Sequence, residues 1–438
     1  MSKHRRVSRR TFLKHTATAA GVAAPYILRP GVLAAAGKPG ANDRVGLGLI
    51  GTGRRGDQML GDMRRVTAQR GEAQIIALSD IWPKKCHDYI KKYEEKTGKK
   101  GGTYAIYQDY RKLLESKDID GVIVTTCDHW HALPTIHACQ AGKDAYGEKP
   151  MTLTIREGRV MIDAVRKYKR VFQTGSQQRS MKRNRVGCEL IRNGLLGKVH
   201  TVICQVYPSS KPCSAHKLPE EPVPEGMDWD MWCGQTPPRP FSWHVYLTYN
   251  KPGWQWLRPF SGGLTTNWGA HGLDMVQWAL GTDDTGPVEV IPEGNKHNSP
   301  VTLKYAGGVV VKLCDPKAPI GGGIFIGEKG KLSMNRGKWH TEPKELATQP
   351  PKDPKVKLYW SDNHLQNWID CIKSRKRCVA DVEIGHRSAT VCHLIGIARR
   401  LGRKLRWDPA RELFVGDTEA NALIDRPKRK PYDLPDPV

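Results

Sequence analysis

The sequence predicts an α/β protein of two domains, the first a doubly wound parallel sheet with helices on both faces. Apolar segments of strand length alternate with helical patterns over residues 42–174, and a glycine-rich turn follows the first of these segments. From residue 175 the alternation stops and the composition changes. A chain of 438 residues is too long for one core and suits two domains, here 42–174 and 175–405.

The first apolar run ends at Ile50 and passes into Gly51-x-Gly53-x-x-Gly56 at the start of a helical pattern. Glycines at this spacing allow a tight turn, close approach of a pyrophosphate and close packing of helix on strand. The helix N-terminus then presents N–H groups to phosphates. A glycine-rich surface loop is the alternative, but the next predicted strand ends in Asp80, where a ligand of a ribose hydroxyl is expected. The predicted dinucleotide ligands are Gly51, Thr52, Gly53, Arg54, Arg55, Gly56 and Asp80.

The remaining elements of the first domain keep the alternation of strands and helices. The predicted strands are 104–107, 121–126, 143–146 and 171–174, with helices ending near Tyr93 and Gln140, one starting at Asp109, and one over 155–168. Continuous apolar strands such as 121–126 are typical of parallel sheets buried on both faces. The loops after Ile50, Ser79, Thr126 and Tyr146 should therefore meet in one crevice.

Two of these loops contain titratable side chains. Lys149, between Glu148 and Pro150, could lower the pKa of a substrate hydroxyl by donating a hydrogen bond, but an ordinary surface Lys–Glu pair fits the spacing equally well. A trio of histidines, His129, His131 and His137, lies on an irregular loop and the helix after it, with no carboxylate cluster nearby. We expect no metal site there.

The composition limits the classes of partner. The formal net charge is +26, but the basic residues are scattered among acids, which favours a solvated basic surface over nucleic-acid binding. The 11 cysteines have neither zinc-site nor disulfide-scaffold spacing. No apolar run reaches the ~18 residues that a bilayer span needs, so we expect no transmembrane helix in the processed protein.

Residues 1–36 resemble an export signal. Ser8-Arg9-Arg10-Thr11-Phe12-Leu13-Lys14 has the twin-arginine form, the mildly apolar stretch 17–28 follows, and Ala34-Ala35-Ala36 offers a cleavage site. We expect a periplasmic or otherwise exported protein and the twin-arginine export machinery as a partner. This route exports folded proteins, so a dinucleotide loaded in the cytoplasm would travel with the chain. Whether the segment is cleaved or kept as an anchor stays open.

The second domain contains most of the tryptophans. Seven of the thirteen fall between Trp229 and Trp278, many in the long excursion 208–260. Long ordered excursions in compact domains are usually functional, and aromatic faces stack on sugar rings. We expect Trp254 and Trp256 to face substrate beside Arg258, and Trp232 and Trp278 to lie in the core.

A helical pattern then places His271 and Asp274 at positions i and i+3, on one face. Histidine suits proton transfer because its unperturbed pKa of ~6.5 lies near working pH. Further strands are predicted within 300–335, an exposed loop over 342–357, helices over 363–374 and 388–401, and a tail over 406–438.

Together these motifs resemble the glucose-fructose oxidoreductase / inositol dehydrogenase family (Gfo/Idh/MocA), in its twin-arginine-exported branch. The matching segments are 51–56, Asp80, 125–131, Ala141-Gly142-Lys143, Glu148-Lys149-Pro150, 173–179 and 268–274. The resemblance implies a Rossmann domain, followed by an α/β domain with a large, open, mostly antiparallel sheet that often forms a homo-oligomer interface.

The resemblance also implies roles for residues. Lys149 would assist at a substrate hydroxyl and His271 would be the acid/base, with Asp274 as its orienting partner. Thr125, Thr126, His131, Glu148 and Lys149 would join the cofactor site, and Gln178, Arg179 and Asn267 the substrate site. Asn267 stands where the family commonly has Asp, and this puts a carboxylate-dyad mechanism in doubt.

The sequence thus predicts an NAD(P)-dependent oxidoreductase that acts on a sugar, glycoside or cyclic polyol. Asp80 favours NAD because its charge would repel a 2′-phosphate, while Lys84 and Lys85 keep NADP as an alternative. A glycoside hydrolase or lyase that oxidises the sugar transiently is the second hypothesis, with Asp274 or Glu148 as acid. A dinucleotide-carrying binding protein for anionic glycans is the third.

Overall fold

The computed structural model describes residues 43–98, 100–247 and 253–438, so the predicted export signal at 1–36 lies outside the described residues. The N-terminal sheet has six strands: β1 Val45–Ile50, β2 Ala73–Ser79, β3 Ala105–Tyr107, β4 Gly121–Val124, β5 Asp144–Gly147 and β6 Phe172–Thr174. They lie in the order β3-β2-β1-β4-β5-β6, and every neighbouring pair is parallel. The order reverses between β1 and β4, which opens a crevice at their carboxyl ends.

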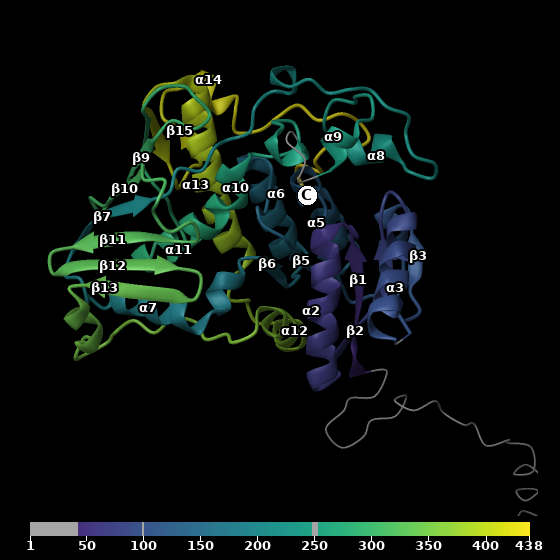
Figure 1. Cartoon of the computed structure of the whole chain (residues 1–438), viewed down its shortest axis with the longest axis horizontal. Helices are drawn as coiled ribbons and strands as arrows, with labels where there is room; N and C mark the ends of the chain where they lie inside the picture. Colours follow the sequence, from purple (N-terminus) through teal and green to yellow (C-terminus); the bar gives the residue numbers. More distant parts are fainter. Residues whose placement is uncertain (1–42, 99, 248–252) are drawn as a thin grey trace, which may run out of the picture.

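Helices cover both faces of this sheet because alternate strand residues point to opposite sides. Val122 and Val124 belong to the core under one set of helices, and Ile123 to the core under the other. The covering helices are α2 Arg54–Arg70, α3 Lys84–Thr97, α4 Tyr110–Leu114, α5 Ala132–Gln140 and α6 Ile155–Lys167. The predicted Rossmann architecture is confirmed (Figure 1).

The second sheet has nine strands, of which only the β7–β10 pair is parallel among those whose pairing the structure describes. Their order is β13-β12-β11-β7-β10-β9-β8-β14-β15. The strands are β7 Val199–Cys204, β8 Glu289–Pro292, β9 Val301–Lys304, β10 Val310–Leu313, β11 Gly323–Gly327, β12 Gly330–Asn335, β13 Lys338–Glu342, β14 Leu405–Asp408 and β15 Leu413–Phe414. The predicted mostly antiparallel sheet is confirmed.

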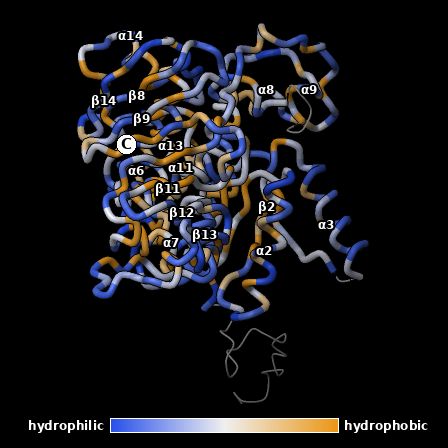
Figure 2. Tube along the Cα trace, turned by 60° about the vertical axis from the view of Figure 1, so that its left-hand side comes forward, coloured by the Kyte–Doolittle hydropathy of each residue, from blue (hydrophilic) through white to orange (hydrophobic). Residues whose placement is uncertain are grey.

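Three long helices pack on one face of the second sheet and share its core: α7 Lys182–Arg192, α11 Gly269–Leu280 and α13 Val382–Leu401. The described residues between β7 and α11 form short helices: α8 Trp229–Cys233, α9 Trp243–Tyr246 and α10 Leu264–Asn267. Figure 1 shows α8 and α9 above the first sheet. Figure 2 shows that hydrophilic residues predominate along α3, at the edge of the molecule.

The packing divides the chain differently from the boundaries expected at 175 and 405. Helix α12, His364–Ser374, follows the second sheet but packs on the first, where the buried Trp368 contacts Tyr146 at 5.8 Å between ring centroids. The segment expected to be a tail adds β14 and β15 to the second sheet and forms α14, Thr418–Asn421. It then returns to the first domain, where Tyr432 packs on Trp130. No helix in the described ranges combines the length and apolarity needed to cross a membrane.

Candidate active site

A cavity of about 840 Å³ lies where the first sheet meets the excursion and α11. Its volume falls within the range of small-molecule and cofactor sites. The loops after β1, β2, β4 and β5 all reach it, as predicted, and the second domain closes it from the other side. The predicted site residues that line it are Gly51, Gly53, Arg54, Arg55, Asp80, Thr125, Thr126, His131, Glu148, Lys149, Trp254, Trp256, Asn267 and His271.

The three glycines of the turn have three different environments. Gly51 has φ +92°, a conformation that favours glycine, and it lies against the backbone of Thr125 and Thr126. A side chain on Gly56 would meet the Gly51 carbonyl oxygen at 2.2 Å, so the close helix–strand contact requires glycine. A Cβ on Gly53 would have open space within 4 Å, and that space belongs to the cavity. The turn therefore fits a pyrophosphate at Gly53, on the N-terminus of α2.

This difference predicts opposite effects for two substitutions. Gly53→Val projects a side chain into the open space, so we expect at least a tenfold loss of NAD affinity with little change in the melting temperature. Gly56→Ala meets backbone, so we expect a lower melting temperature first. Calorimetric titration with NAD and a thermal melt of each variant measure the two effects. A Gly53→Val protein that binds NAD as the wild type does would contradict the assignment.

Asp80 lies at the end of β2, beside the glycine turn. Its carboxylate accepts hydrogen bonds from the backbone N–H of Thr52 at 2.8 Å, from the Thr52 hydroxyl at 2.9 Å, and from the Trp82 N–H at 3.0 Å. Burial raises the pKa of Asp80, and these hydrogen bonds oppose the rise. Thr52, predicted as a dinucleotide ligand, does not line the cavity. Its hydrogen bonds instead hold the Asp80 carboxylate in place beside the cavity.

Glu148 and Arg55 join two of the converging loops. The Arg55 guanidinium donates to Glu148 Oε1 at 2.7 Å, and Gln177 donates to the same oxygen at 2.9 Å. The Glu148 side chain is 5% exposed, so this is a largely buried pair. Arg55 is thereby held against the Lys149 loop, and its charge is already matched by a carboxylate.

Lys149 and His271 enter the same cavity from the two domains. Lys149 Nζ donates to the backbone oxygen of Asn267 at 3.3 Å, just ahead of α11, which carries His271. Burial lowers the pKa of Lys149, while the Glu148 and Asp128 carboxylates act to raise it. One face of the cavity therefore presents an ammonium group and an imidazole side by side.

His271 is buried, at 5% exposed, and neutral. Burial lowers its pKa well below the ordinary value, and the charges of Lys149, Arg336 and Arg55 add to the effect. Its Nδ1 is enclosed and meets no hydrogen-bond partner among the residues that the structure describes. A neutral imidazole has one unprotonated ring nitrogen and can accept a proton there.

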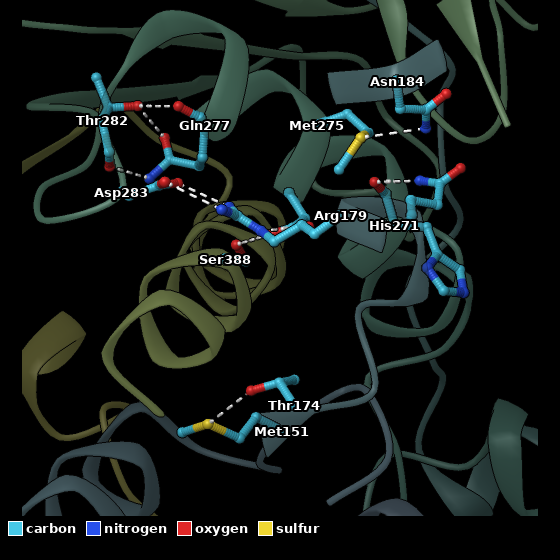
Figure 3. Close-up of polar contacts among 12 residues, drawn as sticks. Met151, Thr174, Arg179, Asn184, His271, Met275, Gln277, Thr282, Asp283 and Ser388 are labelled. Atoms are coloured by element: carbon cyan, nitrogen blue, oxygen red, sulfur yellow. Dashed lines mark hydrogen bonds and ion pairs between the residues drawn. The ribbon is translucent and has the colours of Figure 1, made fainter. Parts of the chain in front are cut away.

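The expected pairing of Asp274 with His271 is wrong. The Asp274 carboxylate instead receives the Arg179 guanidinium at 2.8–3.0 Å and the Ser388 hydroxyl at 2.8 Å. Arg179 also binds Asp283, so the guanidinium lies between two carboxylates at 1% exposure, where it cannot reach a substrate. Figure 3 shows Arg179 extending towards Asp283 and away from the His271 ring. Asp274 and Arg179 form a buried structural pair, outside the cavity lining.

Two further substrate-binding predictions are corrected by the geometry. Gln178 is fully buried, and its amide donates to the backbone oxygens of His271 and Gly321 at 3.0 Å, so it positions the helix that carries the imidazole. Arg258 lines a separate pocket. Trp232, expected in the core, is buried but also lines the main cavity, whereas Trp278 is buried in the core.

Sequence reasoning missed two charged residues of the cavity. Asp128 is buried, accepts a hydrogen bond from the Ser261 hydroxyl at 2.7 Å, and has a pKa raised by burial. It lies in the loop that follows β4, Gly121–Val124, so its position after a strand end was a usable signal. Arg336 reaches the cavity from the turn between β12 and β13 and lies 5.7 Å from the Trp268 ring. No motif surrounds it in the sequence.

No group of three His, Cys, Asp or Glu side chains in the described part of the chain is placed to hold a metal ion. The three histidines of the predicted loop and the helix after it each contact another protein group. His129 contacts the Trp232 backbone oxygen at 2.8 Å, His131 contacts that of Pro150 at 2.6 Å, and His137 contacts the Tyr110 hydroxyl at 2.8 Å.

Comparison with protein families also divides the chain into two domains. Residues 45–176 match the family described as "Oxidoreductase family, NAD-binding Rossmann fold". Residues 189–434 match "Oxidoreductase family, C-terminal alpha/beta domain". Both are domains of the Gfo/Idh/MocA family, and the second match alone spans more than half of the chain.

Individual relatives are more distant. An inositol 2-dehydrogenase of Burkholderia ambifaria is 24% identical over 275 residues, which are 61% of this chain and 66% of the relative. A glycosyl hydrolase family 109 protein of Akkermansia muciniphila is 24% identical over 159 residues, or 35% of this chain and 32% of the relative. The chain therefore spans less than two thirds of the length of these curated relatives.

Among solved structures, the WlbA dehydrogenase of Chromobactrium violaceum, in complex with NADH and UDP-GlcNAcA, is similar in fold. It is 19% identical with a TM-score of 0.58, and the match covers 84% of this chain and 97% of that one. With the fold, the glycine turn and the two family matches agreeing, the chain belongs to the Gfo/Idh/MocA oxidoreductase family, and its first domain is the NAD-binding domain of that family.

Proposed function

We propose that this protein is an exported, NAD-dependent oxidoreductase that acts on a hydroxyl group of a sugar, glycoside or cyclic polyol. One observation carries the proposal: a single cavity brings the glycine turn and Asp80 together with Lys149 and His271, whose pKa burial lowers. The first group of residues fits a dinucleotide, and the second fits the removal of a proton from an alcohol.

The residues divide the chemical work between them. His271 accepts the hydroxyl proton at a ring nitrogen, and the buried setting keeps the imidazole neutral and ready. Lys149 donates a hydrogen bond to the same substrate oxygen and stabilises the negative charge that develops there. Asn267 lies beside them and can hydrogen bond a neighbouring hydroxyl, although it cannot take a proton. NAD, when bound, supplies the acceptor for the hydride that leaves the carbinol carbon.

Aromatic side chains supply the apolar part of the substrate site. Trp254, Trp256 and Trp268 line the cavity from the excursion and the start of α11, as does Tyr246. Their ring faces suit the C–H faces of a sugar, whose hydroxyls the polar groups opposite can hold. The relatives named inositol 2-dehydrogenase support a cyclic polyol or sugar as the substrate class.

Export favours a cofactor that stays bound. The twin-arginine pattern at Ser8–Lys14 supports transport of a folded, loaded protein, because free dinucleotide is scarce outside the cytoplasm. A retained cofactor must be restored in place, so we propose that oxidation of one sugar is followed by reduction of another. We also propose a homo-oligomer, since alternate residues of β10, β11 and β12 leave the outer face of the second sheet partly exposed.

A second candidate is a glycoside hydrolase or lyase that oxidises its sugar transiently. Oxidation acidifies the adjacent C–H, and loss of that proton expels the aglycone and leaves an unsaturated ketone. In a hydrolase, water then adds to the double bond and reduction of the ketone restores the sugar, whereas a lyase keeps the double bond. This route needs an acid for the leaving group. Asp274 and Glu148 are paired with Arg179 and Arg55, whereas Asp128 lines the cavity, and burial raises its pKa. The relative in glycosyl hydrolase family 109 supports this candidate.

One experiment tests both candidates. The exported protein is purified, its nucleotide is released for mass and redox state, and the protein is incubated with a panel of sugars and glycosides. Keto-sugar and free aglycone are followed separately, with Asp128→Asn beside the wild type. Keto-sugar that forms in both proteins supports the oxidoreductase, whereas aglycone release that Asp128→Asn abolishes supports the hydrolase or lyase. A protein that contains no bound nucleotide and does not bind added NAD would contradict both candidate functions.

A further inference from the structure

A second pocket, of about 310 Å³, lies between α13, the C-terminal segment and the excursion, and it is strongly basic. Among the described residues its lining includes one carboxylate, Asp425, and five cationic side chains: Lys211, Arg258, Arg399, Arg400 and Arg426. None of the residues that line it lines the NAD cavity.

Arg399 is the most unusual of these side chains, because its guanidinium is 1% exposed and has no carboxylate partner in the described structure. Its Nε and Nη1 donate only to neutral oxygens, including the backbone oxygens of Ser299 at 2.8 Å and Tyr207 at 2.6 Å. Its Nη2 is buried and meets no partner in the described part of the chain. Burial accordingly lowers the pKa of Arg399 to about 10. Burying a cation without a counter-ion costs free energy, and a bound anion next to the Arg399 guanidinium would offset that cost.

Two neighbouring arginines also have lowered pKa values, although the Glu157 carboxylate, outside the lining, acts to raise that of Arg426. Burial lowers the pKa of Arg426 to about 10, and burial together with Arg400 lowers that of Arg258. The one carboxylate of the lining, Asp425, already accepts hydrogen bonds from Lys428 and from the Thr154 hydroxyl. The guanidinium charges therefore exceed what the protein itself neutralises.

The two pockets lie on opposite sides of one segment. Trp256, Leu264 and Asn267 line the NAD cavity, whereas Arg258, Gly262 and Thr266 line the second pocket. Because the linings interleave along residues 256–267, the second pocket adjoins the substrate side of the cavity. Arg258, which the sequence suggested as a substrate ligand, belongs to this second pocket.

We propose that the second pocket binds an oxyanion, a sulfate, phosphate or carboxylate group, held by Arg258, Arg399 and Arg426. Guanidinium groups match these anions because their planar N–H groups bind two oxygens at once. The anion would supply the charge that Arg399 lacks. It is either a free ion or a substituent on a sugar, and the volume of the pocket accommodates both.

Calorimetric titration of the full exported protein, saturated with NADH to block the pyrophosphate site, tests the proposal. The probes are inorganic sulfate, glucose 6-sulfate, glucose 6-phosphate and glucuronate at constant ionic strength, with glucose as the neutral control. We expect at least one anionic probe to bind and glucose not to compete with it. Stronger binding of a sugar ester than of inorganic sulfate identifies a sugar substituent, and equal binding identifies a free ion; either supports the pocket.

Two single variants, Arg258→Gln and Arg426→Gln, should each weaken binding of the anion at least tenfold while the NAD affinity stays within twofold. They avoid Arg399, whose loss removes hydrogen bonds to two backbone oxygens. Arg426 also donates to the backbone oxygen of Arg258, so a thermal melt of Arg426→Gln checks its fold, and Arg258→Gln tests the pocket independently. Arg406→Gln, an exposed arginine of β14 outside the pocket, makes the same change of charge and should leave binding unchanged. Failure of every anion to bind, or equal binding by both pocket variants and the wild type, would overturn the proposal. A separate titration of the protein with NADH alone shows whether the nucleotide assignment fails.

Discussion

Replacing His271 with glutamine should lower kcat for sugar oxidation by roughly 10²- to 10⁴-fold, the range that general-base catalysis contributes. Glutamine keeps the size and polarity of the side chain but cannot accept the hydroxyl proton. NAD affinity should stay within twofold, because His271 lies on α11, away from the glycine turn. Steady-state kinetics and titration with NAD measure the two quantities.

The pH profile separates a base from a merely structural histidine. Burial lowers the pKa of His271 well below its ordinary value, so the acid limb of kcat/KM, where the imidazole gains its proton, should lie at a lower pH than for an ordinary histidine. His271→Gln should lack this limb. His340→Gln, on exposed β13, is the matched control and should keep both the rate and the limb. A His271→Gln enzyme with wild-type kcat would contradict the assigned role.

The second large effect concerns stability. Arg179→Met should lower the free energy of unfolding by roughly 3–5 kcal/mol, because it leaves Asp274 buried without its positive partner. The matched control is Arg403→Met, since Arg403 also pairs with two carboxylates, Asp417 and Glu419, but is 42% exposed. Because solvent screens an exposed pair, we expect a much smaller change for Arg403→Met than for Arg179→Met.

Denaturant unfolding of both variants measures this difference. If Arg179→Met were as stable as the wild type, the buried pair would not hold α11 against the segment 177–180. A stable Arg179→Met protein with a raised KM for the sugar would return Arg179 to the substrate site, as the sequence suggested.

The sequence predicted the parts of the site that local rules determine. The glycine turn, Asp80 and the Lys149 loop could be placed together because the carboxyl ends of parallel strands meet at one edge of a sheet. His271 could be placed through its helix and the family resemblance. Those residues do line one cavity.

The sequence could not show which distant side chain reaches a given residue. The i, i+3 spacing put Asp274 on the face of His271, but Arg179 and Ser388, far away in the chain, occupy its carboxylate. Arg336 enters the cavity from a β-turn without any local signal. Likewise, the pattern of α12 showed an apolar face, but nothing in it indicated that this face packs on the first sheet rather than the second.

The central claim is that the cavity passes a hydride from a sugar carbon to bound NAD while His271 takes the hydroxyl proton. A single-turnover reaction with a substrate deuterated at the reacting carbon tests it most directly, with mass spectrometry of the released nucleotide. We predict that the nucleotide carries one deuterium, and that His271→Gln slows its appearance by the same factor as kcat. A substrate that is converted while the nucleotide remains free of deuterium would contradict the claim.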